Sequence, residues 1–259
     1  MQSREVLVSQ SVGLKPSKVR SGDGRAPVNC NALTIDGDRL YSGGSDGLIV
    51  SIDLASGRNH GPNRISGSAT SSVLTLATRK DHGLASGTVG GEIQLWDPRA
   101  QSESHPVLSL SLGCNHSVSA LDFHPVEWSY LLSVGSWAGT IFLLDLRKIG
   151  SQHPLLGHRN FQLNEGPIWE ARFAGPQNLV SCSEDGTLFC WSVESTITDT
   201  DQRPSPWLQQ SSGEEEGIKV ASILGGAQSL GINSFDIDRR DDPNSRVIFA
   251  SDNESIALI

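Results

Sequence analysis

A histidine, two serines and an aspartate that could do hydrolytic chemistry lie close together in the sequence. His158 precedes Ser181, Ser183 and Asp185. In a hydrolase such residues would act as general base, nucleophile and orienting carboxylate. Neither a G-x-S-x-G nucleophile elbow nor a turn suited to an oxyanion hole accompanies them. We therefore expect a structural role, because a histidine that bridges a hydroxyl and a carboxylate satisfies groups that would each cost about 1–3 kcal/mol if buried unpaired.

Other candidates for a chemical site carry weaker signals. The four cysteines form no CxxC pair, so the sequence predicts neither a zinc site nor a redox motif. The glycine-rich turns at 42–47 and 86–91 lack the GK[ST] ending and open no helix, so they are not phosphate loops. The acidic run at 236–242 lacks the spacing of a calcium-binding EF-hand loop. We predict no enzyme, no cofactor and no small-molecule substrate.

Composition and charge exclude several classes of partner. The chain has 20 basic and 29 acidic residues and a net charge of -9, whereas binding to nucleic acid or to an anionic membrane needs a basic face. No apolar stretch approaches the length of a membrane span, and the first residues do not resemble a secretory leader. A reducing compartment is therefore expected. The 27 glycines and 12 prolines indicate many tight turns between short strands.

An internal repeat organises the chain. Each of five copies opens with apolar or small residues at offsets 0, 3 and 5, and the copies start 43, 45, 50 and 64 positions apart. A second strand rich in small residues follows and ends in a turn that usually bears glycine. A third strand passes through a common position, occupied in the five copies by Ile52, Trp96, Leu144, Trp191 and Ile259. A period near 40 residues indicates a repeat architecture.

The strand pattern predicts an all-β fold. Alternating apolar positions around a glycine turn indicate a β-hairpin. Outer strands are expected at 107–112, 154–156 and 218–224, which would complete four-stranded antiparallel sheets. Such a sheet cannot bury both faces alone, so the sheets must stack as the blades of a β-propeller.

The best-formed copy resembles a WD repeat. It combines the pair Gly157-His158, the turn residue Asp185 and Trp191 in the third strand. By that resemblance the fold is a WD40-type β-propeller with five recognisable blades. The resemblance also implies a hydrogen-bonded structural tetrad of His158, a second-strand serine (Ser181 or Ser183), Asp185 and Trp191.

The sequence predicts two parts and one insertion. Residues 1–26 form an N-terminal strand and linker, and residues 27–259 form the blades. A polar insertion at 195–217 lengthens one connector and has Trp207 as its anchor, and Trp207 is also a candidate partner-binding residue. The segment 5–9 could close the ring by pairing with the last blade, which would remove an exposed edge. Alternatively, it belonged to a blade whose remainder is missing.

Several residues suggest interaction instead of catalysis. Trp96-Asp97-Pro98-Arg99 resembles the WDxR signature of substrate receptors of cullin-4 ubiquitin ligases, so Asp97 and Arg99 are candidate partner-binding residues. The alternative is that Asp and Arg brace a blade corner, as repeated in Asp145 and Arg147. Trp137, which lies in a turn, and Trp128 are aromatic residues that a hairpin could leave exposed, and an exposed Trp is a candidate binding hot spot. Packing between blades is the other interpretation.

Longer runs of sequence resemble one family of propellers. The runs at 93–99, 106–113, 168–173, 179–191, 218–224 and 230–237 resemble, in that order, the nucleoporin forty-three family, WD-repeat subunits of the Y-shaped outer-ring scaffold of the nuclear pore complex. That family is seven-bladed, so the resemblance implies that two N-terminal blades are absent and that the five-bladed ring is either closed or incomplete.

The resemblance implies a function. It predicts a non-catalytic scaffold subunit of the nuclear pore outer ring that supports pore assembly and nucleocytoplasmic transport, including mRNA and protein transport. Its partners would be an α-solenoid and other subunits of the Y complex, with no direct nucleic acid and no membrane insertion. Its location would be the nuclear envelope, and some animal members visit kinetochores in mitosis. The alternative function is a substrate receptor of a cullin-4 ubiquitin ligase or another generic WD40 adaptor.

Overall fold

The computed structural model of the chain forms strands throughout the part that it describes. The described residues are 28–55, 63–64, 71–81, 83–98, 106–113, 115–125, 129–147, 158–162, 164–193, 218–224, 230–237, 246–252 and 256–258. They contain 19 strands and no helix. Consequently none of these residues belongs to a helix that could span a membrane.

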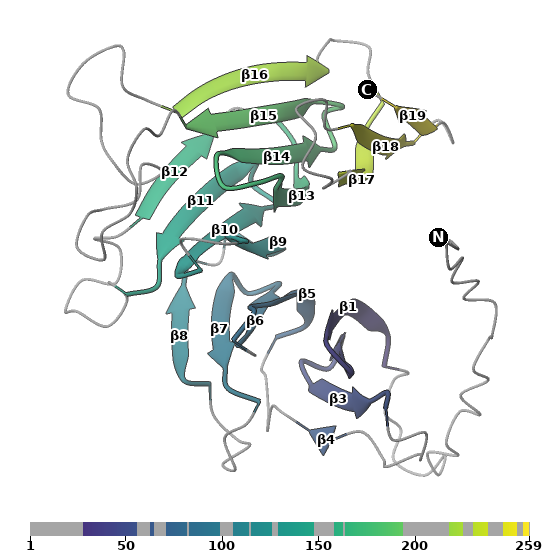
Figure 1. Cartoon of the computed structure of the whole chain (residues 1–259), viewed down its shortest axis with the longest axis vertical. Helices are drawn as coiled ribbons and strands as arrows, with labels where there is room; N and C mark the ends of the chain where they lie inside the picture. The colour runs from purple at the N-terminus through teal and green to yellow at the C-terminus, as the bar shows by residue number, and fades with distance from the viewer. Residues whose placement is uncertain are drawn as a thin grey trace, which may run out of the picture.

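The strands form five antiparallel sheets, which follow one another along the chain and around an axis (Figure 1). Blade 1 contains β1 (Cys30–Asp36), β2 (Arg39–Gly44), β3 (Ile49–Asp53) and β4 (Asn63–Arg64). Blade 2 contains β5 (Val73–Thr78), β6 (Leu84–Thr88), β7 (Glu92–Trp96) and β8 (Leu108–Ser111). Blade 3 contains β9 (Val118–Phe123), β10 (Leu131–Ser136), β11 (Thr140–Asp145) and β12 (His158–Gln162). Within each blade the strands pair in sequence order.

The last two blades follow the same plan. Blade 4 contains β13 (Ile168–Phe173), β14 (Asn178–Ser183), β15 (Leu188–Val193) and β16 (Ile218–Leu224). Blade 5 contains β17 (Ile232–Ile237), β18 (Val247–Ser251) and β19 (Ile256–Leu258). The prediction of an all-β propeller with five recognisable blades is confirmed, and the five first strands begin at the predicted residues.

A β-bulge explains the unusual spacing of the first strands. Offsets 0 and 3 would point to opposite faces of a regular strand, because side chains alternate. Each first strand shifts its register between offsets 0 and 2, for example between Val73 and Thr75 and between Ile168 and Glu170. The bulge therefore brings offsets 0, 3 and 5 to one face.

Glycine closes the hairpin between the second and third strands. Gly47, Gly91, Gly139 and Gly186 have φ angles of 76°, 78°, 76° and 79°. Only glycine takes these values without strain, which is why the turns recur as Gly-bearing sequences.

Four hydrophobic clusters join the five blades. Each cluster combines the second and third strands of one blade with the bulged face of the next blade. The first strands contact in series, β1 on β5, β5 on β9, β9 on β13 and β13 on β17. In Figure 1 the arc of described blades has an open side between β1 and β17–β19.

Some predicted features lie outside the described residues. These are the N-terminal strand and linker at 1–26 with its segment 5–9, the outer strand at 154–156, the insertion at 195–217, and Ile259. The described outer strand of blade 3 is β12, which starts at His158. The other two outer strands, β8 and β16, lie within or at the predicted ranges.

Candidate functional site

The indole of Trp191 is bound inside blade 4. Its Nε1 donates a hydrogen bond of 2.9 Å to Oγ of Ser181, and both residues are buried. Blade 2 repeats this arrangement, since Trp96 Nε1 donates to Ser86 Oγ at 2.9 Å. A hydroxyl that accepts a buried indole N–H is held in the core, so Ser181 is poorly placed to attack a substrate.

Asp185 holds the turn between β14 and β15. Its carboxylate accepts hydrogen bonds from the backbone N–H of Thr187 at 2.9 Å and of Glu165 at 2.8 Å. Burial alone would raise the pKa of Asp185, but hydrogen bonds from Thr187 and Glu165 outweigh it, and the pKa is lowered. The carboxylate therefore stays ionised and ties the turn to the chain that enters blade 4.

The structure assembles part of the predicted tetrad. Ser181 and Trp191 bond directly, whereas Ser183 donates its hydroxyl to the carbonyl of Gly166 at 3.1 Å. The backbone of His158 pairs with Leu144 in blade 3, and its side chain lies outside the described residues. The complete tetrad stays a prediction.

The third-strand aspartates brace blade corners. Asp145 is buried and accepts from Arg147 Nε at 3.1 Å and Nη2 at 3.0 Å. The Arg147 guanidinium lies 3.3 Å from the ring centroid of Tyr130, a cation–π contact that the sequence did not suggest. In blade 1, Asp53 accepts from the backbone N–H of Ala55 at 2.9 Å. These contacts are those expected if the aspartates stabilise the corners of the repeated blades.

The predicted docking residue Asp97 borders a hollow of about 200 Å³. Arg79 and Asp81 also line it, joined by an ion pair of 2.6 Å. The hydrogen bond from Arg79 is the main reason that the pKa of Asp81 is lowered. Arg99 lies outside the described residues. The role of Asp97 and Arg99 in binding a partner therefore stays a prediction.

Of the three predicted aromatic hot spots, the structure describes Trp137. This residue follows β10 and is 47% exposed. Its ring meets Trp169 edge-on, with 6.2 Å between centroids. Trp137 is thus half covered by a neighbour and half presented to solvent, which suits an anchor for a partner. Trp128 and Trp207 lie outside the described residues.

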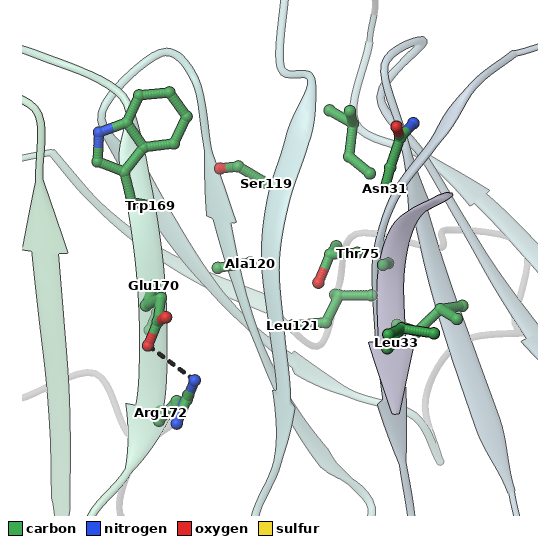
Figure 2. Close-up of a pocket in the computed structure, with 13 residues that line it drawn as sticks. Asn31, Leu33, Thr75, Ser119, Ala120, Leu121, Trp169, Glu170 and Arg172 are labelled. Atoms are coloured by element: carbon green, nitrogen blue, oxygen red, sulfur yellow. Dashed lines mark ion pairs between the residues drawn. The ribbon is translucent and has the colours of Figure 1, made fainter. Parts of the chain in front are cut away.

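Sequence reasoning missed a hollow of about 280 Å³ between the first strands (Figure 2). Residues of β1, β5, β9 and β13 line it, among them Trp169, Glu170 and Arg172. The signal was present in the alternation of IWEARF, where the apolar offsets face one way and the charged residues between them face the other.

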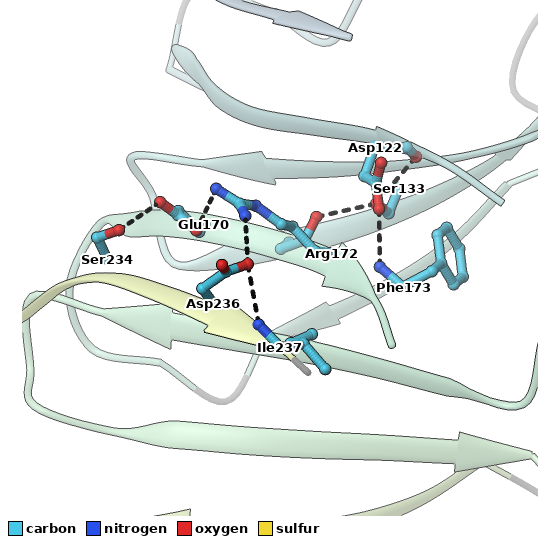
Figure 3. A network of polar contacts seen from close by, with 9 residues as sticks. Asp122, Ser133, Glu170, Arg172, Phe173, Ser234, Asp236 and Ile237 are labelled. Carbon is cyan, nitrogen blue, oxygen red and sulfur yellow. Dashed lines mark hydrogen bonds and ion pairs between the residues drawn. The ribbon is translucent and has the colours of Figure 1, made fainter. Parts of the chain in front are cut away.

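A polar network runs from this hollow to blade 5 (Figure 3). Glu170 accepts from Ser234 at 2.9 Å and pairs with Arg172 at 2.9 Å. Arg172 also approaches Asp236 at 3.7 Å. Burial raises the pKa of Glu170, against the opposing effect of Arg172. The Glu170 carboxylate forms an ion pair with the Arg172 guanidinium and accepts a hydrogen bond from Ser234 of blade 5, so the network joins blades 4 and 5.

A similar contact joins blades 3 and 4. The Asp122 carboxylate accepts from the backbone N–H of Phe173 at 2.8 Å. Ser133 Oγ lies 3.1 Å from the carbonyl of Asp122 and 3.2 Å from that of Ala171 (Figure 3).

In the part of the chain that the structure describes, no group of three His, Cys, Asp or Glu side chains could hold a metal ion.

Comparison with known proteins agrees with this arrangement. The family model "WD domain, G-beta repeat" matches residues 153–192. Nucleoporin Nup43 of Mus musculus is 25% identical over 237 residues, and that of Homo sapiens is 24% identical over 237 residues. Nuclear pore complex protein nup43 of Dictyostelium discoideum is 27% identical over 168 residues, which are 64% of this chain and 38% of that protein. The chain is similar to Nup43.

The similarity has a defined extent. The mouse and human matches cover 80% of this chain and 59% of each relative, so the chain spans less than two thirds of the length of these relatives. The predicted resemblance to WD-repeat nucleoporins is confirmed by these matches and by the WD40 repeat.

Solved structures support the fold. A structure of the WD40 repeats of RRP9 and one of U3-55K each superpose with a TM-score of 0.63 at 18% identity, covering 90% of this chain. They cover 61% and 62% of those chains. At this identity the likeness shows a WD40 propeller architecture and says nothing of function. The similarity to Nup43 and the matched WD40 repeat point to a non-catalytic role.

Proposed function

We propose that the chain is a scaffold and interaction subunit of the nuclear pore complex, within the Y-shaped outer ring, where it supports pore assembly and nucleocytoplasmic transport. The observation that carries this proposal is the similarity to Nup43 of mouse, human and Dictyostelium over 64–80% of the chain. A WD40 fold, which commonly serves protein interaction, is consistent with it.

The local chemistry supports a binding role. Ser181, Asp185 and Asp145, which resemble catalytic residues in type, all make bonds that hold strands, turns or corners together. The exposed half of Trp137 offers a flat amphipathic surface of the kind found at binding hot spots. We propose an α-solenoid subunit of the Y complex as the partner, the nuclear envelope as the location, and kinetochores as a second location in mitosis.

Localisation and purification test the proposal. The full chain, tagged and expressed at its natural level, should label the nuclear rim and should copurify with outer-ring nucleoporins, quantified by mass spectrometry. A Trp137→Ala variant should lower that recovery at least tenfold, since loss of a hot spot costs about 2 kcal/mol or more. Val107→Ala is the matched control, because Val107 is also exposed but lies beside the outer edge of blade 2.

Two negative outcomes have different meanings for the scaffold role and for Trp137. Diffuse localisation together with background recovery of nucleoporins would refute the scaffold proposal. Equal losses in the Trp137 and Val107 variants would remove Trp137 from the interface while leaving the scaffold role in place.

The rival function is a substrate receptor of a cullin-4 ubiquitin ligase, and it rests on Asp97 and Arg99 of the WDxR-like motif. The Arg99→Glu variant distinguishes the ligase-receptor function from the scaffold function. Loss of the ligase adaptor from the purified complex, without recovery of nucleoporins from the wild-type chain, would favour the rival. Nucleoporin recovery that is unchanged in Arg99→Glu, with no ligase adaptor in either sample, would favour the scaffold.

A further inference from the structure

In every blade, the residue that directly follows the second strand is held in the same way. Its backbone N–H donates a hydrogen bond of 2.9–3.0 Å to the carbonyl of the residue just before the first strand. Because this bond recurs, the five side chains stand at the same end of their blades, and all five are exposed. The five residues are Ser45, Val89, Trp137, Glu184 and Asp252.

Three of these residues, Val89, Trp137 and Glu184, form a surface that we call the turn ridge. They belong to blades 2, 3 and 4, and each of these blades packs against a described blade on both sides. Val89 is 41% exposed and Trp137 is 47% exposed, whereas Val118 and Ile168, at the starts of the neighbouring first strands, are fully buried. The turn ridge therefore presents an apolar, an aromatic and an acidic side chain in that order.

Val89 and Trp137 are linked through one residue of blade 3. The Val89 carbonyl accepts a hydrogen bond from Oγ of Ser117 at 2.6 Å, and the Ser117 carbonyl accepts one from the Trp137 backbone N–H at 3.0 Å. The turns that carry the two exposed side chains are therefore adjacent across the junction between blades 2 and 3.

The segment 164–167 links the turn of Trp137 to that of Glu184 across the next junction. A Cβ placed on Gly139, in the Trp137 turn, would lie 3.1 Å from the carbonyl oxygen of Gly166, so this turn rests on the segment. The same segment accepts the backbone N–H of Glu184 at 3.0 Å. The turn ridge is thus continuous over blades 2, 3 and 4.

The end of the blades that carries the turn ridge is acidic. It consists of the turns after the second strands and the segments that enter the first strands, described at 28–29, 45–48, 71–72, 89–91, 115–117, 137–139, 164–167, 184–187, 230–231 and 252. These described residues include no Lys or Arg, and they include the carboxylates of Asp46, Glu165, Glu184, Asp185 and Asp252. Glu165 and Glu184 are exposed, and neither forms an ion pair with a described residue.

Basic side chains of the described residues stand elsewhere. Arg79 and Arg147, for example, follow the ends of β5 and β11 at the opposite end of the blades, where each is paired with an aspartate. Within the described part of the chain, no neighbouring cation therefore offsets the negative charge beside the turn ridge.

Charge complementarity decides which kind of partner segment fits. A Lys or Arg cation is attracted both to the face of an indole and to carboxylates. Trp137 supplies the indole, and Glu165 and Glu184 supply the carboxylates. An acidic segment would be repelled by the same carboxylates. Burial of Val89 and Trp137 drives association, whereas the charges select the partner.

We propose that the turn ridge binds a basic segment of a partner protein. An apolar side chain of that segment covers Val89, and a Lys or Arg next to it lies over the Trp137 indole and faces Glu165 and Glu184. This binding mode rests on the proposed scaffold function, in which Trp137 is a docking residue, and it defines the surface of the partner as basic and apolar.

Peptide binding to the purified full chain tests this chemistry. The probe is a fluorescein-labelled octapeptide of alternating Arg and Leu residues, and its counterpart carries Glu in place of Arg. Fluorescence anisotropy should give at least tenfold tighter binding of the Arg peptide. The affinity of the Arg peptide should fall at least threefold when NaCl is raised from about 50 mM to about 300 mM, because salt screens exposed charges.

Two variants and a control locate the site. Trp137→Ala should weaken binding of the Arg peptide at least tenfold, and Glu184→Lys should weaken it at least threefold. Asp38→Lys is the matched control, because it makes the same change in net charge at an exposed residue between β1 and β2, at the opposite end of the blade. It should change the affinity less than twofold. Glu184 is exposed, so Glu184→Lys still decides if Trp137→Ala fails to fold.

The same variants separate this site from the scaffold function. When the tagged chain is purified from cells, Glu184→Lys should lower the recovery of outer-ring nucleoporins at least threefold relative to Asp38→Lys. A chain that binds the Arg peptide at the turn ridge but recovers no nucleoporins would support the basic-segment site and refute the scaffold function. A chain that recovers nucleoporins but does not distinguish the two peptides would refute the basic-segment site and leave the scaffold function in place.

Three results would overturn the proposal. One is equal affinity for the Arg and Glu peptides, which would show an occupant bound by apolar contact alone. Another is equal weakening by Glu184→Lys and Asp38→Lys, which would show binding to the net charge instead of to the turn ridge. The third is self-association of the chain, measured by light scattering, that Trp137→Ala abolishes, since a second copy would then cover the turn ridge.

Discussion

The fit between Gly43 and Val73 gives the sharpest test of how the blades are joined. We expect Gly43→Ala to destabilise the protein although it adds only one methyl group. The new Cβ would lie 2.5 Å from Val73 Cγ1 and 3.1 Å from Val73 Cβ, whereas carbon atoms normally approach to about 3.5–4.0 Å. Gly43 has no positive φ, so the effect isolates the contact between blades from backbone strain.

The magnitude follows from the cost of overpacking. A methyl group forced into a filled core costs about 1–3 kcal/mol. For a domain of this size each kcal/mol shifts Tm by roughly 2–4 °C, so Tm should fall by roughly 2–12 °C. Differential scanning calorimetry and urea unfolding would measure the change. Gly175→Ala is the control, since no atom lies within 4 Å of its added Cβ, and it should change Tm little.

A second substitution checks the cause. Val73→Ala alone removes two buried methyl groups and should cost about 1–3 kcal/mol. In the double variant Gly43→Ala with Val73→Ala, the new methyl occupies the space that Val73 leaves. The combined loss should therefore be at least about 1 kcal/mol smaller than the sum of the single losses. Additive losses, or a stable Gly43→Ala protein, would refute this account of blade stacking.

Three further predictions concern single groups. Ser181→Ala should cost about 1–3 kcal/mol in urea unfolding, because it leaves the buried N–H of Trp191 without its acceptor; a neutral result would contradict the bond. The pKa of Asp185 is lowered, so its stabilising effect is full above about pH 4, the ordinary pKa of Asp, and is lost as the pH falls through the folded-state pKa. The excess stability of the wild type over Asp185→Asn, followed by thermal melts between pH 2 and 7, should shrink on acidification, and a constant difference would exclude the proposed role. Burial raises the pKa of Cys182 to about 12, so its thiol should resist iodoacetamide at pH 8 until urea unfolds the protein, whereas the exposed Cys30 should react at once; equal rates in the native protein would refute the packing of blade 4.

The sequence predicted the inner strands well because burial on two sides constrains them. The starts at Val73, Val118 and Ile168 are those of the structure, since each residue fits against the preceding blade and leaves few alternatives. The bulge behind the odd spacing was not foreseen, although the spacing itself requires it.

Outer strands were predicted less well. β12 begins at His158, beyond the expected 154–156, and the two-residue strand β4 was not predicted. An outer strand pairs with a neighbour on one side, so its sequence carries a weaker pattern.

The residues of the central hollow were missed for a related reason. Glu170 and Arg172 lie between the apolar offsets of β13, where charged residues normally indicate a solvent-exposed face. In a propeller that face lies towards the next blade, so the two charges pair with each other and with blade 5. Their role depends on how the blades pack around the axis. The residue pattern of a single strand does not show that packing.

The distribution of satisfied and exposed groups favours docking over catalysis. A polar group that already bonds within the protein gains little from a ligand, and Ser181, Asp185 and Asp145 are in this state. Exposed apolar side chains gain free energy when another surface covers them, and Trp137 and Leu33 are in that state. Binding of a partner would therefore be driven mainly by burial of exposed apolar side chains. These lie at the turn that carries Trp137 and at the two ends of the arc of blades.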